Sequence, residues 1–200
     1  MDNDPIHEKF AAWTVGCDPL RSRIVVFEKV RDIPYAYPAS RDPIEVLRQD
    51  RGSCSGKHYL LGEMFRRLGL PIRHIICTHR FNESPLVFPD EMQEMLRKNE
   101  IVDLHDYLQI HLGGEWIDVD ATWESGLRAF GFPVNEDWDG VTSMALSVVP
   151  EDHAIVEKDP DRLKDEMLSK LTPRQRNLRK QFLEALSKWV AECEAELQQR

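Results

Sequence analysis

The apolar residues of this chain change their spacing near residue 70, and that change constrains the fold more than any other feature. Before it, apolar side chains recur every three or four residues, which is typical of helices with one buried face. After it, residues 72–78 form a β-branched run and residues 105–112 alternate between polar and apolar side chains, which indicates strands. Helices followed by an antiparallel sheet predict an α+β fold.

Four helices are expected before the change in spacing. Asp-Pro pairs precede the first three, where Asp can cap the free N–H groups and Pro favours the first helical turn. In the third helix we expect Ile44 and Leu47 to be buried. The predicted apolar stripes and helices are Ile6–Trp13, Leu20–Phe27, Ile44–Leu47 and Cys54–Leu68.

A hairpin is the clearest strand signal. Residues 105–112 lead into Gly113-Gly114, and residues 116–119 return as the partner strand. We expect a further strand at 144–149. Between the first strand and the hairpin, residues 80–102 contain a predicted helix and are expected to form a wall or lid of a cleft.

The end of the chain is predicted to be helical. Thr172 and Gln175 form a capping box around Pro173, and an apolar stripe that includes Cys193 follows. We therefore expect an α+β domain at 1–156 and amphipathic helices at 157–200, packed on that domain or on a partner, including a second copy of the chain. Five basic residues in this part are expected to dock on the acidic domain: Lys170, Arg174, Arg176, Arg179 and Lys180.

The composition excludes several classes of function. A net charge of −9 disfavours nucleic acid as the main partner. The sequence has no run of about 18 apolar residues and no secretory signal, so neither a membrane span nor export is expected, and the predicted location is the cytoplasm. The four cysteines lack the spacing of a zinc site, so we expect reduced thiols and no metal.

Cys54 differs from the other three cysteines. It lies in Gly-Ser-Cys-Ser-Gly at the start of a predicted helix, where small neighbours leave the sulfur accessible and the helix terminus stabilises a thiolate. Cys77 lies within an apolar strand, Cys17 in a turn and Cys193 on a helical stripe, which favours structural roles. Cys54 is therefore the candidate nucleophile.

A nucleophilic thiol needs a base and an acid that orients the base. His105 opens one strand of the hairpin, and Asp120 follows the partner strand, so the two lie close together at the open end. Asp118 alternates onto the same face and stays an alternative. His58 follows Cys54 by one helical turn, where it could add positive charge but would approach the sulfur poorly.

Four motifs in order resemble the transglutaminase-like cysteine enzymes. The matching segments span about residues 33–125, with Tyr107 in place of the family's Trp and Ala121 in place of its Pro. They are Gly52-Ser53-Cys54, Leu68-Gly69-Leu70-Pro71-Ile72-Arg73, His105-Asp106-Tyr107-Leu108-Gln109-Ile110 and Trp116-Ile117-Asp118-Val119-Asp120-Ala121-Thr122-Trp123.

The resemblance implies a transglutaminase-like or papain-like core with Cys54 as nucleophile, His105 as base and Asp120 as orienting acid. It implies hydrolysis or acyl transfer through an acyl-thioester, with no cofactor and with a peptide, protein or small amide as substrate. Tyr35, Tyr37 and Ser53 are the candidates for contacts to the substrate and the oxyanion. The alternative is a non-catalytic binding module on the same fold, with the helical tail as its docking element.

Overall fold

The computed structural model describes residues 4–156 and 159–199, and its centre is an antiparallel sheet. The strand order is β3-β2-β1-β4, so the hairpin strands and the β-branched strand are neighbours, as the sequence indicated. The predicted α+β fold is confirmed. The strands are β1 (Ile72–Arg80), β2 (Val102–Leu112), β3 (Glu115–Val119) and β4 (Ala154–Val156).

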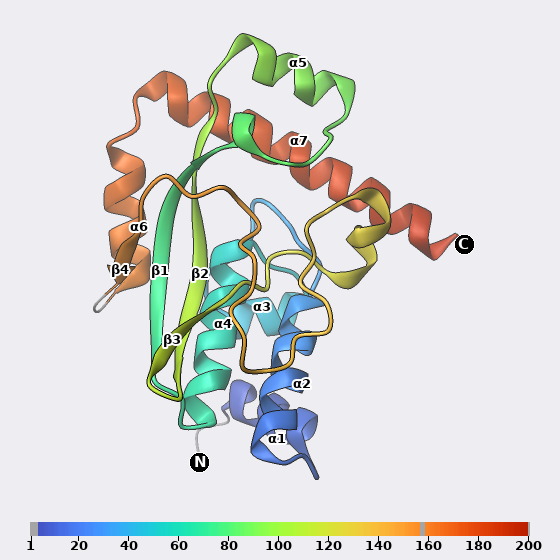
Figure 1. The fold of residues 1–200 in the computed structure, drawn as a ribbon. Helices are drawn as coiled ribbons and strands as arrows, with labels where there is room; N and C mark the ends of the chain where they lie inside the picture. The colour runs from blue at the N-terminus through green and yellow to red at the C-terminus, as the bar shows by residue number, and fades with distance from the viewer. Residues whose placement is uncertain (1–3, 157–158, 200) are drawn as a thin grey trace.

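Helices account for most of the remaining regular structure (Figure 1). The first three begin as predicted, with an Asp side chain that accepts backbone N–H groups and a Pro in the first turn, and α6 begins in the same way at Asp159-Pro160. The α-helices are α1 (Pro5–Thr14), α2 (Pro19–Arg31), α3 (Pro43–Gln49), α4 (Cys54–Arg67), α5 (Asp90–Lys98), α6 (Pro160–Ser169) and α7 (Pro173–Gln198), and the short 3-10 helices are η1 (Phe81–Glu83) and η2 (Ser125–Phe130).

The first hydrophobic core lies between the sheet and the early helices. Alternation along β2 turns Leu108 and Ile110 toward α4, where they join Leu61 and Phe65, all fully buried. Tyr107 points to the other face of the sheet, where it packs with buried residues of β1. This packing fixes the direction of α4, whose first turn lies near the end of the sheet where α6 and α7 pass (Figure 1).

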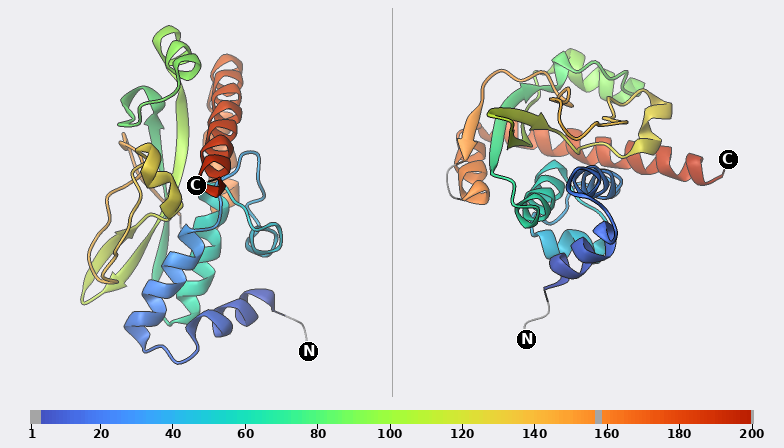
Figure 2. Two further views of the ribbon diagram at one scale, coloured as in Figure 1. Left: turned by 90° about the vertical axis from the view of Figure 1, so that its right-hand side faces the viewer. Right: turned by 60° about the horizontal axis from the view of Figure 1, so that its bottom comes forward.

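A second hydrophobic core depends on the C-terminal helix. Figure 2 (left) shows α7 on the same side of the sheet as α2 and α4. Phe182 on α7 packs against Phe81 and Phe88 of the segment 80–102, with ring centroids 4.5 and 5.3 Å apart. Cys193 is buried in the same cluster, as its place on the apolar stripe predicted. The predicted helix between residues 80 and 102 is α5, which packs against α7.

Two details of the sequence prediction are wrong. Residues 144–149 do not form a strand; they form a loop in which the Met144 N–H donates to the Asp118 backbone oxygen of β3 and the Ser147 N–H donates to the Asp120 carboxylate. The fourth strand is β4, on the opposite edge of the sheet beside β1. In α3, Ile44 is 44% exposed and Val46 is the buried residue, because the short helix presents a different side to α4.

The predicted domain boundary follows residue 156, and the next two residues, 157–158, lie outside the described part of the chain. Beyond them, α7 contacts α5, η2 and β2. The division into two domains stays a prediction. Within residues 4–156 and 159–199, none of the helices has the length and apolar character needed to cross a bilayer.

Candidate active site

Cys54 is the first residue of α4, directly after the N-cap residue Ser53. Its side chain is half-buried. The preceding Gly52 forms a parallel bridge with Tyr35, which ties the turn to the segment after α2. A Cβ atom on Gly56 would lie 2.5 Å from the Ser40 carbonyl oxygen, so this position needs glycine for close packing of backbone on backbone.

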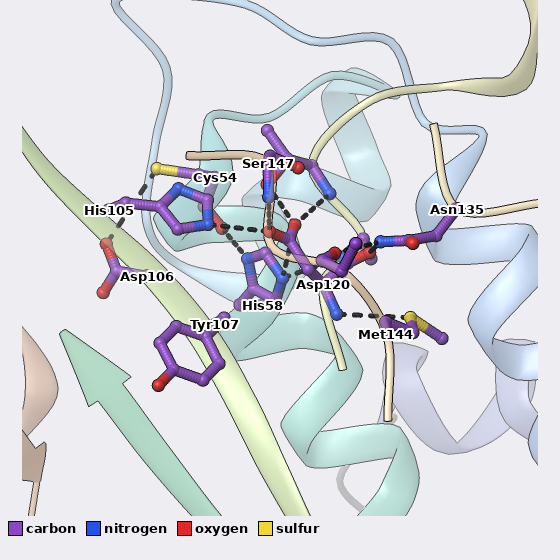
Figure 3. A network of polar contacts seen from close by, with 12 residues as sticks. Cys54, His58, His105, Asp106, Tyr107, Asp120, Asn135, Met144 and Ser147 are labelled. Atoms are coloured by element: carbon purple, nitrogen blue, oxygen red, sulfur yellow. Dashed lines mark hydrogen bonds and ion pairs between the residues drawn. The ribbon is translucent and has the colours of Figure 1, made fainter. Parts of the chain in front are cut away.

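His105 and Asp120 meet at the open end of the hairpin, as predicted. The register of β2 and β3 pairs Leu108 with Val119, which leaves Asp120 just beyond the last pair. The Nε2 atom of His105 lies 2.9 Å from Oδ2 of Asp120, and both side chains are buried. The other ring nitrogen of His105 faces the Cys54 sulfur (Figure 3). The alternative acid, Asp118, accepts a hydrogen bond from Gln109 instead.

The Asp120 carboxylate is held by donors from two further segments. Its Oδ1 atom accepts hydrogen bonds from the Thr122 hydroxyl at 2.6 Å and the Thr122 backbone N–H at 3.0 Å. Its Oδ2 atom accepts from the backbone N–H of Ser147 at 2.7 Å. Donors to a carboxylate stabilise its charged form, so Asp120 is fixed in position as an anion.

The three groups favour a thiolate and an imidazolium. Burial opposes the charged thiolate, but Lys164 and the hydrogen bond from His105 together lower the pKa of Cys54 below its usual value. Burial also opposes a charged His105, and the Asp120 carboxylate overcomes it, raising the pKa of His105 well above its usual range. Despite burial, His105 keeps the pKa of Asp120 well below its ordinary value.

His58 has a structural place in the site that sequence reasoning missed. Its Nδ1 atom donates to the backbone oxygen of Cys54 at 2.7 Å, and its Nε2 atom accepts from the backbone N–H of Ala121 at 2.9 Å. Burial lowers the pKa of His58 to about 4, so the ring is neutral and adds no positive charge. The signal available in the sequence was its position one turn after Cys54, where a side chain can return to the helix N-terminus.

A buried ion pair lies on the other side of Cys54, and no motif in the sequence predicted it. The Asp106 carboxylate accepts from the Ser55 hydroxyl at 2.8 Å and pairs with Lys164 of α6. Asp106 Oδ2 also lies 4.0 Å from the Cys54 sulfur. Asp106 belongs to the matched motif after His105, but its partner lies 58 residues further along the chain.

Among the described residues, Cys54 lines at least two cavities. The larger, about 260 Å³, is lined by Tyr35, Tyr37 and Ser53 together with residues of α6 and α7. The smaller, about 30 Å³, is lined by Cys54, His105 and Tyr35 and includes Phe81 from the predicted wall segment. The three predicted substrate and oxyanion residues therefore lie beside the sulfur. Burial and the nearby Cys54 charge raise the pKa of Tyr35 well above its usual value, so its phenol stays a donor.

Cys77 and His74 line neither of these cavities. Cys77 is fully buried in β1, and burial raises the pKa of its thiol to about 11. His74 packs against the Tyr59 ring. His79 packs against Phe81 and lines the smaller cavity together with Cys54 and His105. In the part of the chain that the structure describes, no group of three His, Cys, Asp or Glu side chains is arranged to hold a metal ion.

A comparison of the sequence with models of known protein families identifies the family. The model of the transglutaminase-like superfamily matches residues 19–121, just over half of the chain. This chain therefore belongs to the transglutaminase-like superfamily, as its motifs predicted. The matched region runs from α2 to the end of β3 and contains Cys54, His105 and Asp120. No curated protein matches the chain.

Solved structures resemble the chain over part of their length. A proposed cysteine protease from Cytophaga hutchinsonii is 16% identical with a TM-score of 0.44; the match covers 62% of this chain and 38% of that one. A TGase is 13% identical with a TM-score of 0.41, covering 58% of this chain and 30% of the TGase chain. This chain thus spans well under half the length of either structure.

Proposed function

We propose that this chain is a cysteine-dependent amide hydrolase or acyltransferase with Cys54 as nucleophile, His105 as base and Asp120 as the acid that orients it. One observation carries the proposal: the His105 ring joins Asp120 through Nε2 at 2.9 Å while its other nitrogen faces the Cys54 sulfur. A nucleophile, a base and an orienting carboxylate in that order form the arrangement that acyl transfer requires.

The first step forms an acyl-thioester. The Cys54 thiolate attacks the carbonyl carbon of an amide, and the C–N bond of the tetrahedral intermediate breaks as the His105 imidazolium gives its proton to the departing amine. Backbone N–H groups at the start of α4 and the Tyr35 phenol are suited to donate to the oxyanion, because both lie beside the sulfur.

The second step releases the acyl group. Water or an acceptor amine attacks the thioester carbon, His105 takes the proton of the attacking group, and the C–S bond breaks to return the thiolate. Water gives hydrolysis and an amine gives transfer. Peptides, proteins and small amides all present the required carbonyl group, and these reactions need no cofactor.

Alkylation with iodoacetamide tests the nucleophile. At neutral pH we expect Cys54 to react at least about tenfold faster than Cys17, because the thiolate is the reactive form and a ring nitrogen of His105 faces the Cys54 sulfur. Cys17 is the matched control, since it is half-buried as well. Peptide mass spectrometry resolves each thiol. The His105→Ala variant is expected to lose the fast reaction.

Acylation tests the catalytic step. With p-nitrophenyl acetate we expect an acetyl group on Cys54 that hydroxylamine removes, and adding an amine shows whether the acyl group passes to it in preference to water. Equally slow alkylation of all four thiols in the folded protein, with no acetyl group on Cys54, would contradict the enzyme proposal and favour the binding module. Oligomeric contacts through α6 and α7 stay a prediction.

A further inference from the structure

The helix α6 places a lysine in the interior of the molecule beside the candidate nucleophile. Lys164 is 2% exposed. Its Nζ atom donates to the Ser55 hydroxyl at 2.7 Å and to the Leu104 backbone oxygen at 3.1 Å, and it pairs with the Asp106 carboxylate. Burying an ammonium group is costly unless its charge is matched and its donors are satisfied. Three partners satisfy all three donors of Lys164.

The partners of Lys164 adjoin Cys54 in sequence and in space. Ser55 is the next residue of α4, and Asp106 Oδ2 lies 4.0 Å from the Cys54 sulfur. An unpaired carboxylate at that distance would oppose a thiolate, because the two negative charges repel each other. Lys164 also lines the larger cavity together with Cys54. The lysine therefore cancels an unfavourable charge and brings a favourable one to the sulfur.

We propose that Lys164 is a positioning residue for the cysteine chemistry: by pairing with Asp106 and by placing its own positive charge beside the sulfur it keeps Cys54 in its thiolate form, so that α6 completes the active site. This inference rests on the proposed function. Lys164 lies beyond residues 19–121, so a part of the chain outside the matched family region supplies this charge.

The electrostatic balance around the sulfur agrees with this role. Among the influences that favour the thiolate, the charge of Lys164 is the largest, and it lowers the pKa of Cys54 against the effect of burial. Other titratable or charged groups line the larger cavity with Cys54 or interact electrostatically with it: Tyr35, Tyr59, Asp103, His105, Asp106 and Arg179.

A second buried lysine shows that burial alone does not create this arrangement. Lys57 is 0% exposed, and its Nζ atom donates to the backbone oxygens of Arg31 and Thr122 at 2.8 and 2.7 Å. Those contacts connect α4 to the end of α2 and to the loop after β3. The ammonium group of Lys164, in contrast, binds Ser55 and Asp106, which both lie beside Cys54.

The test is the pH profile of Cys54 alkylation by iodoacetamide in the Lys164→Met variant. Methionine keeps much of the side-chain volume and removes the charge. We expect the midpoint of the profile to rise, and the rate at a pH below the wild-type midpoint to fall about tenfold or more, since one pKa unit changes the thiolate fraction tenfold. A residue with only a structural role would leave the midpoint unchanged.

Two further variants complete the experiment. Asp165→Asn is the control, since Asp165 follows Lys164 on α6 and its exposed carboxylate pairs with Arg41. This variant is expected to keep the wild-type pH profile of Cys54 alkylation. The double variant Lys164→Met/Asp106→Leu replaces the buried pair with apolar groups, which proteins often tolerate. Its midpoint is expected to lie between those of the wild type and Lys164→Met. The variant loses the lysine charge that favours the thiolate, but it also loses the carboxylate that opposes the thiolate, whose effect is smaller. If Lys164→Met does not fold, the double variant replaces it in the measurement.

Each outcome decides the inference. A wild-type midpoint in folded Lys164→Met, or in the double variant if only that one folds, would overturn the role of Lys164. That result would leave the proposed function intact as long as Cys54 still reacts faster than Cys17. If wild-type Cys54 reacts no faster than Cys17, the proposed function itself fails, and the inference fails with it.

Discussion

His58 connects Cys54 to the residue after Asp120 through both of its ring nitrogens. One nitrogen binds the backbone of Cys54 and the other binds the backbone of Ala121, next to Asp120. Because His58 is fully buried, no water is at hand to replace either hydrogen bond. A single neutral side chain therefore keeps the start of α4 at a fixed separation from the loop after β3.

Replacing His58 is expected to destabilise the fold. His58→Ala leaves the buried N–H of Ala121 without its acceptor, removes a second donor from the Cys54 backbone oxygen and opens a cavity, so we expect a loss of about 3 kcal/mol or more in the free energy of unfolding. Urea denaturation measures it. The control His7→Ala changes an exposed residue of α1 and is expected to stay within about 0.5 kcal/mol of the wild type. Equal stability of the two variants would contradict the bridging role.

At the scale of elements, α7 closes the second core and binds the sheet through one ion pair. The basic residues near its start were predicted to dock on the acidic domain. In the structure they bind different partners. Arg179 pairs with the buried Asp103 of β2. Arg176 donates to backbone oxygens at the end of α6, and Lys180 lies 3.8 Å from Glu184 on its own helix. Electrostatic docking on β2 is therefore concentrated in Arg179.

Removing the charge of Arg179 is expected to weaken the attachment of α7. Arg179→Leu leaves the Asp103 carboxylate buried without its cation, which typically costs about 3 to 5 kcal/mol. The matched control Lys180→Leu removes the neighbouring exposed charge and is expected to change stability by less than about 1 kcal/mol. Thermal and urea unfolding compare the two variants. Similar losses in both would contradict a specific role for the buried pair.

Across the whole molecule, buried histidines make the stability depend on pH. Burial lowers the pKa values of His58, His74 and His79 from 6.5 to about 4 each. As the pH falls below 6.5, the unfolded chain binds protons that the folded protein does not, so stability decreases until about pH 4. Each histidine contributes about 3 kcal/mol to that decrease.

Other titratable groups offset only part of this loss of stability. Burial raises the pKa of Glu124 from 4.5 to about 7, so the folded protein binds this proton first, and stability rises by a similar amount as the pH falls through that interval. His105 has a raised pKa, so its contribution is already complete below pH 6.5. The pKa of Asp120 is lowered, so its contribution is lost only below about pH 4.

We therefore expect a net loss of about 6 kcal/mol between pH 7 and pH 4, which is comparable to the whole stability of many domains. Thermal unfolding followed by circular dichroism at half-unit pH steps measures it. The variant His79→Phe, which keeps an aromatic ring against Phe81, is expected to give a shallower pH dependence. If stability changes as steeply with pH in this variant as in the wild type, His79 is not among the groups that bind a proton on unfolding.

Local patterns accounted for the elements and for much of the candidate site. The caps of Asp and Pro, the capping box of α7 and the hairpin are all present where the residues indicated them. The proximity of His105 and Asp120 was predictable too, because a hairpin turn sets the register of two neighbouring strands. The strand at 144–149 was predicted wrongly, since Leu146 and Val148 pack against the sheet from a loop whose own N–H groups bind Asp118 and Asp120.

The sequence by itself determined which residues begin helices, which pair across the hairpin, and that Cys54 stands at a helix N-terminus. These properties depend on residues a few positions apart. Only the tertiary structure decided which charges surround the sulfur. Lys164 meets Ser55 across 109 residues and Arg179 meets Asp103 across 76. Such partners are selected by the packing of whole helices on the sheet, which no local pattern of residues encodes.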